Sequence, residues 1–240
     1  MFATDENRNH CHRKGSIVLW SGILFWLVFA NAGLAAEQTL QKKGAPENVH
    51  LFGTVEFRSS LKVLPQWKRV MLLAQRQVKE FGQCRGKACS PVAASWQLMV
   101  AKNRSRPPME QLIAVNRFFN KWPYRLDMEL FGVSDYWAAP GEFMRLSGDC
   151  EDYSIAKYYA LKTLGFDIRR LRIVVVKDRI RNIAHAVLAV YLEGTAFILD
   201  NLSDLVLEHG KYTHYIPQYS VNEKKRWSHV KPLKNMKKVF

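Results

Sequence analysis

A single cysteine among three acidic residues, in the segment Ser147–Asp152, constrains the fold of this chain more than any other feature. Gly148 allows the chain to turn tightly, and Asp149 is a residue type that favours the N-cap of a helix. Apolar side chains then recur at helical spacing through Tyr153–Leu164. We therefore predict a helix with one buried face, with Cys150 in its first turn.

The electrostatics of this predicted helix start are in conflict. The positive end of the helix dipole favours a thiolate at Cys150, whereas neighbouring carboxylates disfavour it. Two arrangements resolve the conflict. Either the side chains of Asp149, Glu151 and Asp152 point away from the sulfur and cap the helix, or a bound cation neutralises them. The residues alone leave both open.

The first 36 residues differ from the rest of the chain. Three basic residues precede an almost wholly apolar run, Ser16–Ala30, and small residues follow up to Ala36. This order is typical of a secretory signal, and we expect cleavage near Ala35 or Ala36. The apolar run is close to the shortest that spans a bilayer, so an uncleaved N-terminal anchor is the alternative. In either case residues 37–240 form one exported domain.

The cysteines of an exported protein are informative. Cys11 lies in the leader, and Cys84 and Cys89 flank a short loop that contains glycine. These two can form a local disulfide in an oxidising compartment, and a metal site is disfavoured because no second cysteine pair follows. Cys150 is then the unpaired thiol. Its acidic surroundings suit a chemical role better than simple burial.

The chain is strongly basic, with a formal net charge of +15. Removal of the leader would reduce it by one, so the exported domain keeps most of this charge. A basic surface favours acidic partners. Because no nucleic-acid-binding motif is present, we expect an acidic protein or a membrane surface rather than nucleic acid.

Hydrophobic spacing predicts a mainly helical first half and an antiparallel sheet in the second, an α+β fold. We expect helices over Leu64–Phe81, Ala93–Lys102 and Met109–Trp122. We expect strands over Arg172–Lys177, Ile183–Leu192 and Ala196–Asn201. Tyr124–Leu146 is predicted to be irregular, and Tyr215–Phe240 to be a polar, basic tail. His209 and His214 flank a glycine and are expected to be exposed loop residues rather than a metal pair.

His185 lies inside a predicted strand, where a histidine is either a hydrogen-bonded core residue or a positioned functional group. If Glu193-Gly194 is a two-residue turn, Leu192 pairs with Thr195, and Asp200 becomes the diagonal neighbour of His185 on the same face. A three-residue turn would place Asp200 on the other face. With Cys150 packed nearby, the first register gives a Cys–His–Asp arrangement for acyl transfer.

These motifs together resemble those of the bacterial transglutaminase-like cysteine peptidases, and most closely their periplasmic, adhesin-processing members. The resemblance runs from about Leu51 to Trp227. It rests on Gly148–Asp152 with Lys157 and Tyr158 in the following helix, on Asp135–Glu142, on His185–Leu188 and on Leu199–Asn201.

The resemblance implies a papain- or transglutaminase-like core and assigns three catalytic roles. Cys150 would be the nucleophile, His185 the general base and acid, and Asp200 the residue that orients the imidazole. The oxyanion would be stabilised by backbone N–H groups near Cys150, with Trp137 nearby.

The resemblance also implies a calcium ion bound by Asp149, Glu151 and Asp152 beside the active site. Carboxylate oxygens are suitable ligands for Ca²⁺, although the segment lacks the spacing of an EF-hand loop. It further implies a periplasmic location, a large and acidic surface adhesin as substrate, and an inhibitory inner-membrane receptor for cyclic di-GMP.

Two alternatives keep the same fold. In a transglutaminase or amidase, an amine rather than water would accept the acyl group, and the three catalytic residues do not distinguish the two. In a non-catalytic binding module, Cys150 would be dispensable. A basic nucleic-acid binder is the third alternative and would show salt-sensitive DNA binding.

Overall fold

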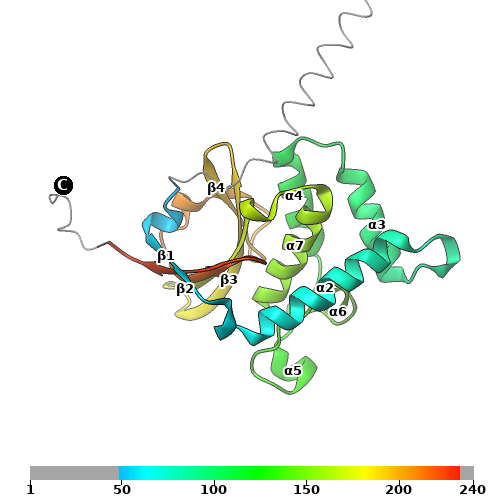
Figure 1. Ribbon diagram of the computed structural model, residues 1–240, viewed down its shortest axis with the longest axis horizontal. Helices are drawn as coiled ribbons and strands as arrows, with labels where there is room; N and C mark the ends of the chain where they lie inside the picture. The colour runs from blue at the N-terminus through cyan, green and yellow to red at the C-terminus, as the bar shows by residue number, and fades with distance from the viewer. Residues whose placement is uncertain (1–48, 233–240) are drawn as a thin grey trace, which may run out of the picture. The chain divides into compact units, whose positions relative to one another are not determined.

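The computed structural model describes residues 49–232. Helices lie on one side of this part of the chain and an antiparallel sheet lies on the other (Figure 1). The predicted α+β class is confirmed. The predicted leader and Cys11 lie outside the described residues. Within residues 49–232, no helix has the length and apolar character needed to cross a membrane.

The helical side contains one long outer helix, two further long helices, two short ones and a central helix. They are α2 (Pro65–Gln83), α3 (Pro91–Asn103), α4 (Pro108–Phe119), α5 (Asp127–Phe131), α6 (Pro140–Leu146) and α7 (Cys150–Leu164).

The sheet has seven strands in the order β1-β7-β6-β2-β3-β4-β5. They are β1 (Val55–Ser59), β2 (Leu171–Asp178), β3 (Ile183–Leu192), β4 (Thr195–Leu199), β5 (Leu207–Glu208), β6 (Tyr215–Val221) and β7 (Arg226–Val230).

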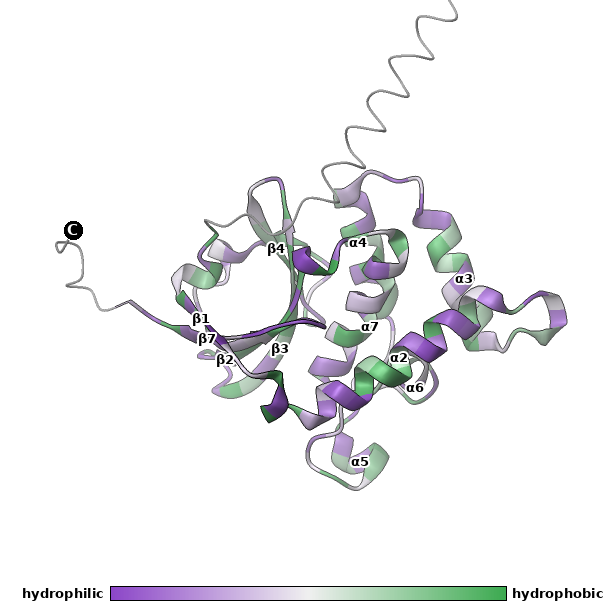
Figure 2. Ribbon diagram, viewed as in Figure 1, coloured by the Kyte–Doolittle hydropathy of each residue, from purple (hydrophilic) through white to green (hydrophobic). Residues whose placement is uncertain are grey.

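Helix α7 is the centre of the core. It was predicted to bury one face, but 12 of its 15 residues are buried. One apolar cluster joins Ile155 and Leu161 of α7 to Leu112 of α4 and Leu188 of β3. The outer helix α2, by contrast, alternates hydrophobic and hydrophilic residues along its length, as Figure 2 shows. Because α7 is enclosed by helices and sheet, its N-terminus is held rigidly.

Prolines and glycines set several helix boundaries. Proline occupies the first turn of α2, α3, α4 and α6, where its missing N–H costs no helical hydrogen bond. Gly165 ends α7 in the left-handed conformation at φ 108°. Helix α4 ends at Phe119, three residues earlier than predicted. The next residue, Asn120, instead donates side-chain hydrogen bonds to the carbonyls of Asp200 and Ser203.

Two predictions of irregular structure were wrong. The stretch 124–146 contains α5 and α6, which are too short to give a clear periodic signal. The supposed tail contains β6 and β7. Pro217 interrupts the pattern of β6 where the pairing with β2 shifts register between Val175 and Val176. The sequence signal of β6 is therefore weak, although the strand lies inside the sheet between β7 and β2.

The β3–β4 hairpin has the predicted register. Leu192 pairs with Thr195 across a two-residue turn, in which Glu193 and Gly194 have φ angles of 52° and 82°. Strand β4 ends at Leu199 rather than Asn201, so Asp200 begins the loop that follows the strand.

The sheet has a second apolar face. Val187, Tyr191 and Ile198 belong to a cluster separate from the one that contains α7. The short helix η1 (Leu51–Gly53) contributes Leu51 to this cluster, and Phe52 and Tyr212 pack against its edge. The N-terminal residues of the domain and the segment before β6 therefore cover this face together.

A disulfide between Cys84 and Cys89 closes the loop between α2 and α3. The side chain of Gln97 on α3 donates hydrogen bonds to the carbonyls of Phe81 and Cys84. The loop therefore fastens the C-terminal end of α2 to α3, at the helical side of the domain.

Gly148 is tightly enclosed at the start of α7. A Cβ atom at this position would lie 2.0 Å from Oδ2 of Asp152. We predict that Gly148→Ala lowers the free energy of unfolding by about 1–3 kcal/mol, because the carboxylate and its backbone hydrogen bonds must move. Denaturant unfolding followed by circular dichroism measures this change.

Gly82→Ala is the matched control for Gly148→Ala. Gly82 lies in α2, and a Cβ atom there meets nothing within 4 Å. Alanine should leave stability unchanged or raise it by about 0.5–1 kcal/mol, because glycine is a poor helix former. Equal effects of the two substitutions would contradict the close contact at Gly148.

Candidate active site

Cys150 is the first residue of α7 and is half-buried. Its Sγ lies 3.3 Å from Oε2 of Glu151. The thiol also interacts with the backbone N–H of Ala186 on β3. The packing of α7 on β3 thus brings the thiol to the residue that follows His185, and no hydrogen bond within residues 49–232 joins the thiol to the imidazole.

His185 and Asp200 form a buried hydrogen-bonded pair. The distance from His185 Nε2 to Asp200 Oδ1 is 2.9 Å, and both side chains are almost fully buried. Within residues 49–232, the Nδ1 atom of His185 has no hydrogen-bond partner. The imidazole is therefore fixed through one nitrogen, and the other is available for proton transfer.

Asp200 is held from several sides. The hydroxyl of Tyr215 donates a hydrogen bond to Oδ2 at 2.6 Å, and the backbone N–H of Leu202 donates one to Oδ1 at 3.0 Å. Burial alone would raise the pKa of Asp200, but the hydrogen bonds from His185, Tyr215 and Leu202 hold it below its ordinary value. Asp200 is thus an ionised acceptor that fixes one tautomer of His185.

The helical side also supports this pair. Asn120, just after α4, donates hydrogen bonds to the carbonyl of Asp200 at 3.1 Å and to that of Ser203 at 3.0 Å. Asn116 donates a further one to Ser203. These bonds fix the backbone after β4, and with it the position of the Asp200 carboxylate.

An acidic cluster adjoins the thiol. Three overlapping groups each bring one atom per residue within 4.8 Å of the others: Asp149 and Glu151 with the Cys150 sulfur, Asp127 with Asp135 and Glu151, and Asp127 with Asp149 and Asp152. Within residues 49–232, one buried oxygen each of Asp127 and Asp149 has no hydrogen-bond partner. Unpartnered buried carboxylate oxygens are costly unless a cation binds them.

The ionisation of this cluster is strongly perturbed. Burial, followed by interactions with the neighbouring acids, raises the pKa of Asp149 to about 9, and burial raises that of Glu151 to about 7. The pKa of the Cys150 thiol is also raised well above its ordinary value, by burial and then by the charges of Glu151 and Asp149. A bound cation would reverse the effect of these charges.

The donor set fits a hard divalent cation. Carboxylate oxygens from separate elements, clustered at short range and partly unsatisfied, are what Ca²⁺ takes as ligands. Asp149, Glu151 and Asp127 would hold such an ion, with Asp135 at the exposed edge of the cluster.

Asp152 differs from the other acids of the motif. Its carboxylate accepts backbone N–H groups from Ala138 at 2.6 Å and from Asp149 at 3.3 Å. It therefore fixes the turn between α6 and α7, although one of its oxygens remains close to those of Asp127 and Asp149. Both arrangements that the sequence left open are present: Asp152 caps the helix, and Asp149 and Glu151 belong to a cluster that suits a cation.

Trp137 packs in the interior of the helical side. Its indole N–H donates to Asp135, and its ring lies edge-to-face with Trp67 at 6.1 Å. No hydrogen bond within residues 49–232 joins Trp137 to Cys150. Its proposed place near the oxyanion stays a prediction.

His209 and His214 were expected to be exposed loop residues, but both are partly buried. Nδ1 of His209 accepts the backbone N–H of Phe52 at 3.0 Å, and the ring of His214 packs against Tyr215 at 4.3 Å. Among residues 49–232, no group of three possible metal ligands contains either histidine. That they are not a metal pair stays a prediction.

Sequence reasoning missed several residues of the site. Asp127 lies in a stretch predicted to be irregular, and Tyr215 begins a strand predicted to be a polar tail. Asn120 falls within the helix predicted over Met109–Trp122, whereas it lies just after the end of α4. Only Asp135 carried a usable signal, because it opens one of the motifs on which the family resemblance rests.

The class of protein follows from comparison with known families. The family model for bacterial transglutaminase-like cysteine proteinases matches residues 74–235, and the chain belongs to this family. A comparison with curated proteins gives no match.

Solved structures of one family member are similar to this chain. Calcium-bound LapG of Legionella pneumophila is 32% identical, with a TM-score of 0.54, over 67% of this chain and 86% of that one. EGTA-treated LapG is 30% identical, with a TM-score of 0.52, over 67% of this chain and 84% of that one. The mixed helical and antiparallel fold is thus shared with LapG.

The buried acids predict how stability depends on pH. Asp149 has an ordinary pKa of 3.8 and a folded-state value of about 9, so the folded chain binds more protons than the unfolded chain between these values. With a chelator present, the unfolding temperature should therefore fall as the pH rises through this range. Added Ca²⁺ should raise the unfolding temperature, and more so at the alkaline end.

The control for this pH dependence is the double variant Asp149→Asn, Glu151→Gln. In chelator, this variant should show a weaker dependence of the unfolding temperature on pH, because the two groups with raised pKa values are gone. Added Ca²⁺ should also raise its unfolding temperature much less than that of the wild type. An identical pH slope in the wild type and in this variant would contradict the assignment of the slope to the cluster.

Proposed function

We propose that this protein is a calcium-dependent cysteine endopeptidase of the periplasm that cleaves the N-terminal region of a large surface adhesin and so releases cells from a biofilm. The observations that support the catalytic part are the buried His185–Asp200 pair and the interaction of the Cys150 thiol with the backbone of Ala186, the residue after His185. Family membership supports proteolysis as the reaction.

In the proposed mechanism, Nδ1 of His185 takes the proton of the Cys150 thiol, and the sulfur attacks the carbonyl carbon of the scissile peptide bond. The imidazolium then protonates the leaving amine, which leaves an acyl-enzyme. His185 next removes a proton from water, which attacks the thioester and frees Cys150. Asp200 keeps the imidazole in one orientation and stabilises its charged form.

Calcium would be held by Asp149, Glu151 and Asp127. When bound, it would supply positive charge next to the nucleophile and so favour the thiolate. The structures of Legionella LapG include a calcium-bound and an EGTA-treated form, which supports a role for calcium in the present protein. Asp152 would keep its place as the acceptor that fixes the turn before α7.

The partners are proposed from charge and from family resemblance. The net charge of +15 favours an acidic substrate, as a surface adhesin would be. We further propose that an inner-membrane receptor for cyclic di-GMP holds the protease inactive by binding it.

Activity assays test the catalytic roles. Cys150→Ala and His185→Ala should each lower cleavage of the adhesin region by about 10⁴-fold or more, and Asp200→Ala by about 100-fold or more. Glu110→Ala, at an exposed acid on α4, is the control and should retain wild-type activity. Full activity in any of the three catalytic variants would remove that residue from the mechanism.

Chelation tests the metal, and the products test the reaction class. Cleavage should stop in EGTA and return with added Ca²⁺, but not with Mg²⁺, which demands a stricter octahedral geometry. Cleavage that is unaffected by EGTA would refute the calcium requirement but would leave the assignment as a protease intact. Incorporation of a labelled primary amine into a glutamine-bearing protein, without cleavage, would establish the acyl-transferase alternative instead.

A further inference from the structure

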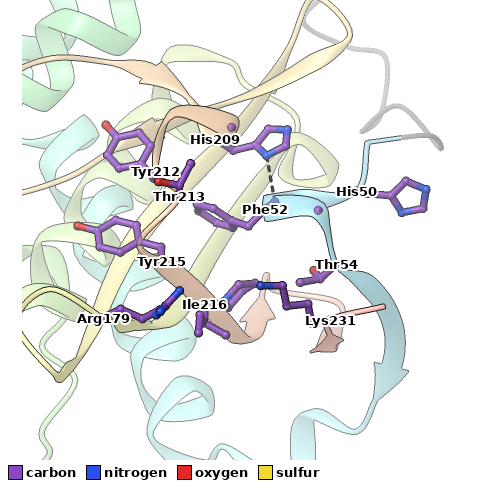
Figure 3. A pocket seen from close by; sticks show the side chains of 13 residues that line it. His50, Phe52, Thr54, Arg179, His209, Tyr212, Thr213, Tyr215, Ile216 and Lys231 are labelled. Atoms are coloured by element: carbon purple, nitrogen blue, oxygen red, sulfur yellow. Dashed lines mark hydrogen bonds between the residues drawn. The ribbon is translucent and has the colours of Figure 1, made fainter. Parts of the chain in front are cut away.

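A cavity of about 450 Å³ lies against the second face of the sheet, away from the apolar cluster of α7. It is bounded by η1 on one side and by the segment 209–217 on the other (Figure 3). This volume is within the range of known ligand-binding sites. Nothing in the proposed mechanism uses the cavity.

The lining combines apolar walls with basic groups. Phe52, Tyr212 and Tyr215 supply aromatic rings, and Arg179 and Lys231 supply positive charges. Figure 3 shows the two basic side chains along the lower part of the view, with Phe52 and Tyr215 above them. The rings are buried or half-buried, whereas both basic residues are exposed. An apolar floor with a charged rim is typical of a surface that binds a peptide.

Within residues 49–232, no ion pair neutralises the positive charge of this cavity. Neither Arg179 nor Lys231 has a side-chain hydrogen bond or ion pair within residues 49–232. No acidic residue is among those that line the cavity. The acids nearest in sequence to the lining residues are Asp178 and Glu208. Asp178 forms an ion pair with Arg181, and Glu208 is exposed and does not line the cavity. Electrostatic complementarity therefore favours an anionic occupant.

Residues 233–240 contain three lysines and no acid, so their charge has the same sign as that of the cavity. A carboxylate-bearing segment from another protein fits the charge better.

The cavity also adjoins the catalytic pair. Tyr215 lines the cavity, and its hydroxyl donates the 2.6 Å hydrogen bond to Asp200. Its ring lies 5.6 Å from that of His185. An occupant that packs on Tyr215 therefore contacts a residue that positions the His–Asp pair.

We propose that this cavity is an exosite for an acidic segment of the protein substrate, distinct from the catalytic residues that act on the cleaved bond. Carboxylates of the segment pair with Arg179 and Lys231, and an apolar side chain between them packs on Phe52 and Tyr215. The inference rests on the proposed protease function. Binding energy from a part of the substrate that does not react raises catalytic efficiency on the whole substrate relative to a short peptide.

The test compares two double variants of the full chain with equal charge change. Arg179→Glu with Lys231→Glu reverses the charge of the cavity lining. Lys87→Glu with Arg104→Glu reverses the charge of two exposed residues on the helical side, neither of which has a side-chain partner within residues 49–232. For the cavity variant, the ratio of kcat/KM on the acidic adhesin region to kcat/KM on a short peptide spanning the same bond should fall about tenfold or more. The control variant should keep the wild-type ratio.

A direct binding measurement separates this proposal from the protease assignment. An Asp- and Glu-rich peptide with one leucine, taken from the adhesin region but lacking the scissile bond, should bind the wild type in calorimetry and bind the cavity variant at least tenfold more weakly, about 1.4 kcal/mol. Equal binding and equal kcat/KM ratios in the two double variants would overturn the exosite. Binding lost only in the cavity variant, with no cleavage by any form, would retain the site and refute the protease.

Discussion

The structure depends on the burial of several carboxylates around the first turn of α7. Oxygens of Asp149 and Glu151 lie beside the Cys150 thiol, oxygens of Asp127 lie near those of both acids, and within residues 49–232 some of these oxygens have no hydrogen-bond partner. Burial of unpaired carboxylates is unfavourable, and the raised pKa values express this cost. A bound divalent cation would offset this cost and would connect α5 to the turn before α7 and to the first turn of α7. The same electrostatics thus govern the stability of this region and the reactivity of the thiol.

The His185–Asp200 pair has the opposite character, because its hydrogen bonds are well satisfied. Asp200 accepts from His185, Tyr215 and Leu202. Asn120 then fixes its backbone from the helical side. The thiol interacts with the backbone of Ala186, the residue after His185, and adjoins the acidic cluster that suits a cation. In the proposed mechanism, calcium would act on the nucleophile without rearranging the His–Asp pair.

The parts of this site that were predictable from sequence are those set by local rules. The two-residue turn at Glu193-Gly194 fixed the parity of the hairpin and so brought Asp200 to His185. The start of α7 followed from its capping residues. Asp127 was not predictable, because it reaches the cluster only through the packing of α5. Tyr215 was missed because β6 contains a proline and a register shift. Its strand forms through pairing with distant segments rather than through its own periodicity.

Calcium-binding calorimetry on the metal-free full chain tests the central claim most directly. The account predicts one tight Ca²⁺ site per chain, at least tenfold weaker in Asp127→Asn or Asp149→Asn because each removes a charged ligand, and unchanged in the exposed control Glu110→Gln. Asp127→Asn is the sharper variant, since only the folded structure assigns Asp127 to the site. No calcium binding by the wild type, or equal binding by Asp127→Asn and the control, would contradict the account.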